Sequence, residues 1–194
     1  MTQSVVSFVV PAHNEEPLLA ATLQAIHGAA TACGIEYEII VADDASTDRT
    51  AHVAADLGAR VVSVQHRQIS ATRNSGARAA SGDVLVFVDA DTVINKDVLR
   101  RALDIVADGA VGGGAAVRFD GRVPFYAKVL LPALTAMMRW MRLAAGCFVF
   151  CTRPAFEAAG GFDERLFGAE EIALSIALKK LGRFVILRET VVTS

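Results

Sequence analysis

The sequence predicts an α/β fold with a mixed, mostly parallel central sheet flanked by helices. Short apolar runs rich in Val, Ile and Phe alternate with longer segments whose apolar residues recur at helical spacing. Strands that are separated by helices imply crossover connections and therefore a mostly parallel sheet. Hydrophobic residues make up 53% of the 194 residues, enough for a buried core, and a single domain is expected.

Seven apolar runs are predicted to form strands. The first, at residues 5–10, is continuous and β-branched, as a strand buried on both faces should be, and Pro11 is expected to end it. The run at residues 112–119 begins with three glycines, which are expected to loosen it. The remaining strands are predicted at residues 38–42, 60–64, 84–88, 147–151 and 184–187.

Five segments are predicted to be helices from apolar spacing and capping signals. Asn95 is expected to cap a helix that runs through residue 107, and Gly82 closes a helix at residues 71–80. A leucine stripe marks a helix at residues 171–181. The other two are predicted at residues 18–32 and from the capping residues 46–48 to about residue 57.

Charge, cysteine content and hydropathy exclude several classes of protein. The formal net charge is −2, whereas a protein that binds nucleic acid usually carries a basic excess, so no nucleic-acid partner is expected. Cys33, Cys147 and Cys151 fit no disulfide framework, and buried free thiols in a reducing cytosol are favoured over a zinc site. The sequence shows neither a signal peptide nor a run of about 18 uncharged apolar residues, so a cytoplasmic protein without a spanning helix is expected.

Polar and acidic side chains follow three of the predicted strands. The first strand is followed by Pro-Ala-His-Asn-Glu-Glu at residues 11–16, and the second ends in Asp-Asp-Ala-Ser-Thr-Asp at residues 43–48. The fourth ends in Asp-Ala-Asp at residues 89–91. Ligands of open α/β sheets collect beyond the carboxyl ends of the strands. One such cluster is more often a turn or a helix cap, but three at corresponding positions indicate a binding site.

Asp89 and Asp91 predict a metal site. Two carboxylates separated by one residue can converge on one hard cation, and Mg2+ or Mn2+ commonly bridges carboxylates to phosphates. The pattern alone occurs often by chance, and the alternative is a turn with a capping aspartate. The position directly after a buried apolar strand favours the metal.

These motifs, in their order, resemble the family 2 glycosyltransferases. The resemblance also rests on Ala-Thr-Arg-Asn-Ser-Gly at residues 71–76, Gly-Gly-Phe-Asp-Glu at 160–164 and Gly-Ala-Glu-Glu at 168–171. It covers nearly the whole chain and implies a GT-A fold, with a nucleotide-sugar-binding half at residues 1–95 and an acceptor-binding half at residues 96–194. It implies an inverting enzyme of cell-envelope or polysaccharide biosynthesis. Such an enzyme moves a sugar from a nucleotide-diphosphate donor to a hydroxyl group of a glycan, a lipid-linked carrier or a small molecule.

The resemblance also implies roles for single residues in the donor site. Asp43 or Asp44 would accept a hydrogen bond from the base imide, which favours a UDP-sugar or another donor whose base has an N–H there. Arg73 would contact diphosphate oxygens, to which a guanidinium is well suited, and the alternative is a solvated helix arginine. The residues implied at the nucleotide are Pro11, Ala12, Asn14, Glu15, Asp43, Asp44, Arg73 and Asp89, and those at the metal are Asp91 and Asp89.

The resemblance places the catalytic base at the start of a late helix, where this chain has Glu170 and Glu171. Glu171 matches the base position and Glu170 the residue before it. Family members usually carry an aspartate as the base, and the extra methylene of glutamate moves the carboxylate outward. This change is compatible with a base that acts on an acceptor bound at a correspondingly shifted position. It is also compatible with a weakened activity. Both glutamates would also stabilise a helix N-terminus, by roughly a few tenths of a kcal/mol, which does not exclude catalysis.

The segment at residues 125–142 allows two interpretations. It is apolar on most sides and carries Lys128, Arg139, Trp140 and Arg142. Basic residues and Trp on an apolar helix are typical of a helix in a membrane interface, which would bring the chain to the inner face of a membrane and to a lipid-linked acceptor. The alternative is a core helix that lines the acceptor pocket, with methionine filling gaps.

Two other functions are compatible with parts of the sequence. A sugar-phosphate nucleotidyltransferase would need a Gly-rich phosphate loop with a basic residue after the first strand, where residues 11–16 are acidic. A non-catalytic nucleotide-sugar-binding module is compatible with glutamate at the base position. Many family members add a metal-binding histidine or a membrane anchor beyond the last strand, and all four histidines here precede residue 67. A third protein ligand is therefore expected to be missing or to lie beyond this sequence.

Overall fold

The structure, a computed structural model, describes residues 5–119, 141, 143–144 and 146–194. Its strands are β1 (Val6–Ala12), β2 (Tyr37–Asp44), β3 (Arg60–Val64), β4 (Val84–Val88), β5 (Thr92–Val93), β6 (Gly112–Phe119), β7 (Phe148–Thr152) and β8 (Phe184–Thr193). Its helices are α1 (Glu16–Cys33), α2 (Thr50–Asp56), α3 (Ile69–Ala79), α4 (Lys96–Ala107), α6 (Arg153–Ala159) and α7 (Glu170–Leu181).

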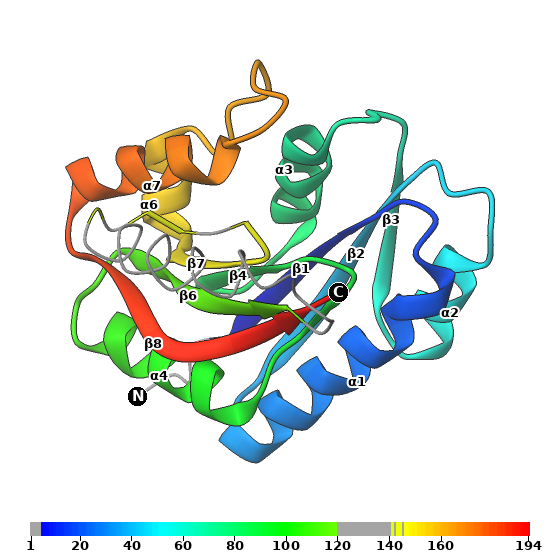
Figure 1. Ribbon diagram of the computed structural model, residues 1–194, viewed down its shortest axis with the longest axis horizontal. Helices are drawn as coiled ribbons and strands as arrows, with labels where there is room; N and C mark the ends of the chain where they lie inside the picture. Colours follow the sequence, from blue (N-terminus) through cyan, green and yellow to red (C-terminus); the bar gives the residue numbers. More distant parts are fainter. Residues whose placement is uncertain (1–4, 120–140, 142, 145) are drawn as a thin grey trace, which may run out of the picture.

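The strands form one mixed sheet in the order β3-β2-β1-β4-β7-β6-β8-β5 (Figure 1). β1 pairs in parallel with β2 and β4, and β2 pairs in parallel with β3. β7 runs antiparallel between β4 and β6, whereas β6 and β8 are parallel. The predicted α/β class with a mixed sheet is therefore confirmed.

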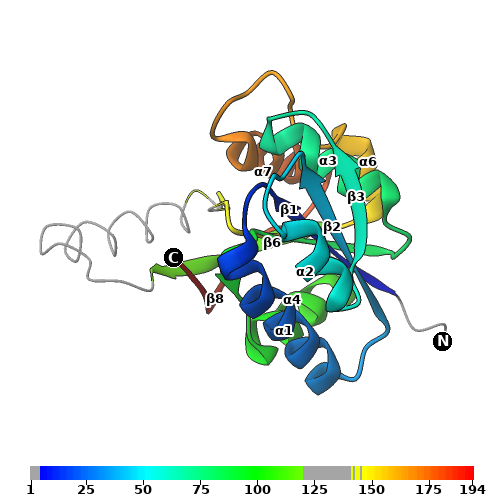
Figure 2. The same ribbon diagram turned by 90° about the vertical axis from the view of Figure 1, so that its right-hand side faces the viewer.

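Different helices cover the two faces of the sheet. α1, α2 and α4 lie on one face and α3, α6 and α7 on the other, as Figures 1 and 2 both show. Along β1, Phe8 and Val10 pack into the core beneath the first set of helices, and Val9 packs into the core beneath the second. A strand buried on both faces explains the uninterrupted apolar run in the sequence.

The pairing of β1 with β2 brings the polar strand ends to one edge of the sheet. Pro11 lies opposite Ala42, and Ala12 lies opposite Asp43. β1 continues through Pro11, so the expectation that this proline ends the strand is wrong. Pairing with β4 already ends at Val9, so one side of β1 is free at Pro11, and a residue without an amide hydrogen is tolerated there.

The glycines at the start of β6 tighten the sheet rather than loosen it. A Cβ atom on Gly112 would lie 2.5 Å from the carbonyl oxygen of Phe150 in β7. The strand therefore needs glycine for close approach to its neighbour, which corrects the expectation from sequence.

Two elements are absent from the prediction, and β8 extends far beyond its predicted end. α6 was missed although Thr152 caps it, Pro154 lies in its first turn and Gly160 ends it. β5 contains only two residues, too few for a pattern. β8 extends beyond residue 187 because an irregularity in its pairing with β6 accommodates the charged Arg188 and Glu189.

The structure describes little of the segment that could form a membrane helix. Of the segment at residues 125–142, only Met141 lies among the described residues. No helix within the described residues has the length and apolar character to cross a membrane.

The three cysteines are free. Burial raises the pKa of Cys147 and Cys151 to about 12, whereas Cys33 is only half-buried.

Candidate active site

Side-chain hydrogen bonds tie the loop after β1 to the loop after β2. Asn14 has a φ of 55°, and its Oδ1 accepts a 2.7 Å hydrogen bond from the backbone of Thr47. The backbone N–H of Asn14 donates to Ser46 Oγ over 2.9 Å. Asp48 in turn accepts from the backbone of Thr50 over 2.9 Å. Part of the polar sequence in these loops therefore holds the loops in shape.

A pocket of about 570 Å³ opens at the carboxyl ends of β1, β2 and β4. It is lined by Pro11, Ala12, His13, Glu15, Asp44, Arg67, Gln68, Ile69, Thr72, Asp89, Ala90 and Asp91. The strand ends singled out in the sequence thus meet at one pocket, as an open α/β sheet requires. The remaining predicted site residues lie outside this lining; they are Asn14, Asp43, Arg73, Glu170 and Glu171.

Asp44 presents a heavily hydrogen-bonded carboxylate to the pocket. It accepts hydrogen bonds from the backbone of His66 (2.7 Å) and Gln68 (3.2 Å) and from the hydroxyl of Thr72 (2.9 Å). Partial burial opposes its ionisation, but these hydrogen bonds outweigh the burial and hold the pKa of Asp44 below its usual range. Asp43 is buried and does not line the pocket, and its Oδ1 has no hydrogen-bond partner among the residues that the structure describes.

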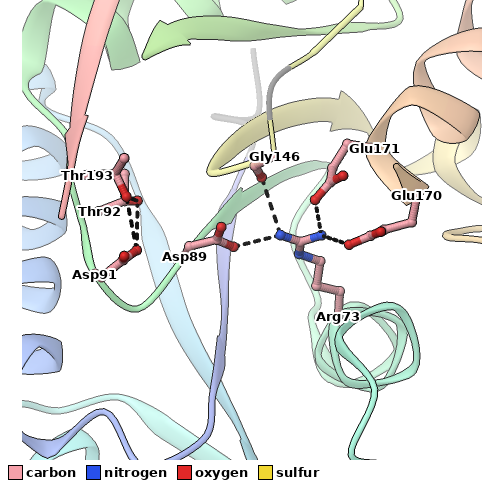
Figure 3. Close-up of polar contacts among 8 residues, drawn as sticks. All are labelled: Arg73, Asp89, Asp91, Thr92, Gly146, Glu170, Glu171 and Thr193. Carbon is pink, nitrogen blue, oxygen red and sulfur yellow. Dashed lines mark hydrogen bonds and ion pairs between the residues drawn. The ribbon is translucent and has the colours of Figure 1, made fainter. Parts of the chain in front are cut away.

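Arg73 lies at the centre of a buried ion-pair network (Figure 3). Its side chain is 1% exposed, and Nη2 lies 2.7 Å from Asp89 Oδ1. On the other side, Nη1 lies 2.6 Å from Glu171 Oε1 and 3.2 Å from Glu170 Oε1. Nη2 also donates to the carbonyl oxygen of Gly146 over 3.3 Å. One guanidinium therefore joins the Asp-x-Asp motif to both glutamates at the start of α7.

The network carries more negative than positive charge, because three carboxylates share one guanidinium. Burial raises the pKa of Asp89, and the negative charges of Glu171 and Asp91 raise it further, although Arg73 acts in the opposite sense. Burial also raises the pKa of Glu170. Burial alone would lower the pKa of Arg73, but Asp89 and Glu171 raise it. A cation beside Asp89 would relieve this excess of negative charge.

Asp91 points away from Arg73, toward hydroxyl groups at the end of the sheet (Figure 3). Its Oδ1 accepts hydrogen bonds from Thr92 (3.3 Å) and Thr193 (3.2 Å), and its Oδ2 accepts one from Ser194 (3.3 Å). The pairing of β5 with β8 places Thr92 opposite Thr193. The end of β8 therefore reaches the Asp-x-Asp motif, a contact between residues about one hundred positions apart that the sequence did not reveal.

The two carboxylates of the Asp-x-Asp motif suit a metal ion whose remaining ligands come from a bound substrate and water. Within the described ranges, no group of three or more His, Cys, Asp or Glu side chains is placed to hold a metal ion. Asp89 and Asp91 provide two carboxylates at the pocket. Magnesium commonly binds one or two protein carboxylates together with water and substrate phosphates.

The segment between β3 and α3, together with the first residue of α3, contributes pocket residues that the sequence did not predict. Arg67, Gln68 and Ile69 line the pocket, and Arg67 Nη1 lies 3.1 Å from Nε2 of His13. Among the residues that line this pocket, Arg67 is the only Lys or Arg. The signal was present, because these polar residues follow the third predicted strand just as the acidic clusters follow the others.

α3 also holds the loop that leads to α7. Asn74 Nδ2 donates to the carbonyl oxygen of Phe162 over 2.9 Å, and Asn74 Oδ1 accepts from the backbone N–H of Phe162 over 2.9 Å. Gln68 Nε2 donates to the carbonyl oxygens of Glu164 and Leu166. Side chains of α3 and of the residue before it therefore position the start of α7.

An α/β sheet with a polar pocket at the ends of its parallel strands is typical of nucleotide-binding proteins. The family model for glycosyl transferase family 2 matches residues 7–157, so the chain belongs to this family. The family resemblance seen in the sequence is therefore confirmed.

Individual relatives agree with this assignment. A dolichol-phosphate mannosyltransferase of Pyrococcus furiosus is 31% identical over 134 residues, which cover 64% of this chain and 38% of the relative. An undecaprenyl-phosphate 4-deoxy-4-formamido-L-arabinose transferase of Pectobacterium carotovorum is 31% identical over 145 residues, covering 69% of this chain and 43% of the relative. The chain thus spans less than half the length of either relative.

A solved structure confirms the GT-A fold. The mannosyltransferase of Pyrobaculum calidifontis, in complex with GDP-Man and Mn2+, superposes with a TM-score of 0.77 at 25% identity. The match covers 99% of this chain and 57% of the mannosyltransferase.

Proposed function

We propose that this chain transfers a sugar from a nucleotide-diphosphate donor to an acceptor hydroxyl group, with inversion and with the help of a divalent metal ion. The observation that carries the proposal is the position of Arg73. Its guanidinium holds Asp89 of the pocket and Glu171 at the base position, 2.7 Å and 2.6 Å away. Arg73 thereby keeps the carboxylate at the donor pocket and the carboxylate of the base close to each other, as a transfer between a bound donor and a bound acceptor requires.

The pocket side chains suit a nucleoside diphosphate. The ionised carboxylate of Asp44 lies in the pocket and can accept the imide N–H of a pyrimidine or purine base. Uracil and guanine both carry this N–H; we expect a UDP-sugar first, and GDP-sugars belong in the same screen. Pro11, Ala12 and Glu15 also line the pocket, and the backbones of Pro11 and Ala12 would contact the nucleoside.

The metal site and the base have separate tasks. Mg2+ or Mn2+ held by Asp91 and Asp89 would neutralise the charge that develops on the departing nucleoside diphosphate. Hydroxyl groups of Thr92 and Thr193 restrain Asp91, and Arg73 restrains Asp89. Glu171 takes the proton of the acceptor hydroxyl as that oxygen attacks the sugar on the face opposite the diphosphate.

The names of two relatives and one segment of the sequence support a proposal for the acceptor. Two relatives are named for dolichol phosphate and undecaprenyl phosphate, which are lipids that carry a phosphate group. Because a phosphate oxygen is already ionised near neutral pH, the proton transfer to Glu171 applies to an acceptor that offers a hydroxyl group of a lipid-linked molecule. We infer a lipid-linked acceptor, reached by peripheral association of the chain with the inner face of a membrane. Basic residues and Trp in the segment at residues 125–142 support this inference.

Thermal stabilisation by nucleotides tests the donor site directly. UDP, GDP, CDP and ADP are compared with and without Mn2+, because a ligand that binds only the folded state raises the melting temperature. We expect UDP or GDP to stabilise the chain more with Mn2+ than without it, and CDP and ADP to act weakly. No shift with any nucleotide would contradict the proposal. A screen of UDP- and GDP-sugars for metal-dependent hydrolysis then separates an enzyme from a binding module.

A further inference from the structure

The main chain at Gly146 lies directly against the carboxylate of Glu171. A Cβ atom on residue 146 would lie 2.6 Å from Glu171 Oε1, 3.1 Å from its Cδ and 3.6 Å from its Oε2. These are the three nearest atoms, and all of them belong to Glu171. The carboxylate therefore occupies the space that a side chain at residue 146 would fill.

Arg73 holds both partners of this contact. Its Nη1 donates to Glu171 Oε1 over 2.6 Å, and its Nη2 donates to the carbonyl oxygen of Gly146 over 3.3 Å. The Glu171 side chain is only 12% exposed. Its carboxylate is thus held by one hydrogen bond from the guanidinium and lies beside the backbone of Gly146 (Figure 3).

We propose that Gly146 is a positioning residue for the base: its missing side chain makes the room that the glutamate at position 171 needs to reach Arg73. This inference rests on the proposed function, in which Glu171 accepts the proton of the acceptor hydroxyl. The extra methylene of glutamate is accommodated at Gly146, so the carboxylate stays on the guanidinium that also holds Asp89.

Backbone geometry does not explain the glycine. Gly146 is not among the residues of positive φ, so alanine is compatible with its backbone conformation. Because the three nearest atoms to an added Cβ all belong to Glu171, an alanine at position 146 tests chiefly this contact. Gly28 in α1 offers a control, since within the described part of the chain a Cβ atom there meets no atom outside its own helix turn within 4 Å, and its φ is also not positive.

A double-mutant cycle tests the contact without any assay of activity. Gly146→Ala is made with glutamate or aspartate at position 171, because the shorter Glu171→Asp side chain withdraws the carboxylate from the added methyl group. With glutamate present, the added methyl group displaces the carboxylate from Arg73, and weakening this buried ion pair is expected to lower the melting temperature by roughly 3 °C or more. With aspartate present, we expect the same change to cost less than about 1 °C. Equal losses in both backgrounds would overturn the inference.

Kinetics test the effect on the base. With Glu171 present, Gly146→Ala is expected to lower kcat about 10- to 100-fold by displacing the carboxylate, while the KM for the donor changes less than about twofold. Adding Gly146→Ala to Glu171→Asp should change kcat less than about twofold, and Gly28→Ala should leave it unchanged. An unchanged kcat in Gly146→Ala would reject the positioning role. If the unaltered chain transfers no sugar, the proposed function fails, and the melting temperatures still decide whether Gly146 makes room for Glu171.

Discussion

The donor side and the base side of the site are built in different ways. On the donor side, Asp44 and Asp89 stand at or just after the ends of β2 and β4, the two strands that flank β1, so the sheet itself brings them together. On the base side, α7 follows a loop in which Gly160, Gly161, Gly168 and Ala169 have positive φ. This loop is held by α3, whose Asn74 lies 88 positions before its partner Phe162. The donor site is therefore a property of the sheet, whereas the base depends on long-range contacts with α3.

Glu171→Gln should break the base side and spare the donor side. The amide cannot accept the proton of the acceptor hydroxyl, so we expect kcat to fall by about 10²- to 10⁴-fold. Gln keeps an oxygen for Arg73, and Asp44 and Asp91 are untouched, so Mn2+-dependent binding of UDP or GDP should be unchanged by calorimetry. Asp91→Asn is the matched change on the donor side and should abolish the effect of Mn2+ on nucleotide binding. Full turnover by Glu171→Gln would remove Glu171 as the base.

Arg73→Met should break the link between the two sides. The change leaves the carboxylates of Asp89, Glu170 and Glu171 without their cation in a buried site. Loss of one partner of a buried ion pair typically costs about 3–5 kcal/mol of unfolding free energy, which urea denaturation measures. The exposed pair of Arg165 with Asp163 provides the control, since Arg165→Met should cause no measurable change. A loss no larger than that of the control would show that the network does not stabilise the fold.

The same contrast explains which parts of the site the sequence could predict. Asp44, Asp89 and Asp91 were predictable because a buried apolar run followed by acid places each of them at one edge of the sheet. Residues 65–68 follow a strand in the same way, so the pocket residues Arg67 and Gln68 were also within reach of this reasoning. The partners of Arg73 were not, because no local pattern connects residue 73 with residues 89, 146, 170 and 171.

Asn74→Ala should loosen the base side by a smaller amount. It removes the two hydrogen bonds with the backbone of Phe162 and leaves that buried backbone unpaired, at a cost of about 1–3 kcal/mol. We expect kcat to fall with little change in nucleotide affinity. Asn14→Ala, which removes the bond to Thr47 on the donor side, should instead weaken nucleotide binding and leave kcat at saturation nearly unchanged. The same kinetic effect from both variants would show that the two sides are one rigid unit.

The smallest expected effect concerns Glu38, a carboxylate that belongs to neither side. It accepts hydrogen bonds from Ser7 Oγ and Ser81 Oγ, each 2.7 Å long, near the amino-terminal end of β2. Partial burial opposes its ionisation, but the hydrogen bonds outweigh the burial and lower its pKa below the usual 4.5. Because the pKa is lower in the folded state, this carboxylate stabilises the fold above about pH 4.5 and loses that contribution as the pH falls through the folded value.

Glu38→Gln should therefore be less stable than the unaltered chain at pH 7, and the difference should shrink below about pH 4.5. Solvent screening keeps the effect below about 1 kcal/mol, and urea denaturation between pH 3 and 7 measures it. Nucleotide binding should be unaffected, because residues near the amino ends of the strands lie away from the pocket at the carboxyl ends. If the difference in unfolding free energy between the two proteins stayed constant with pH, the hydrogen bonds of residue 38, and not its charge, would account for the stability. A loss of nucleotide binding would instead show that the two ends of the sheet are coupled.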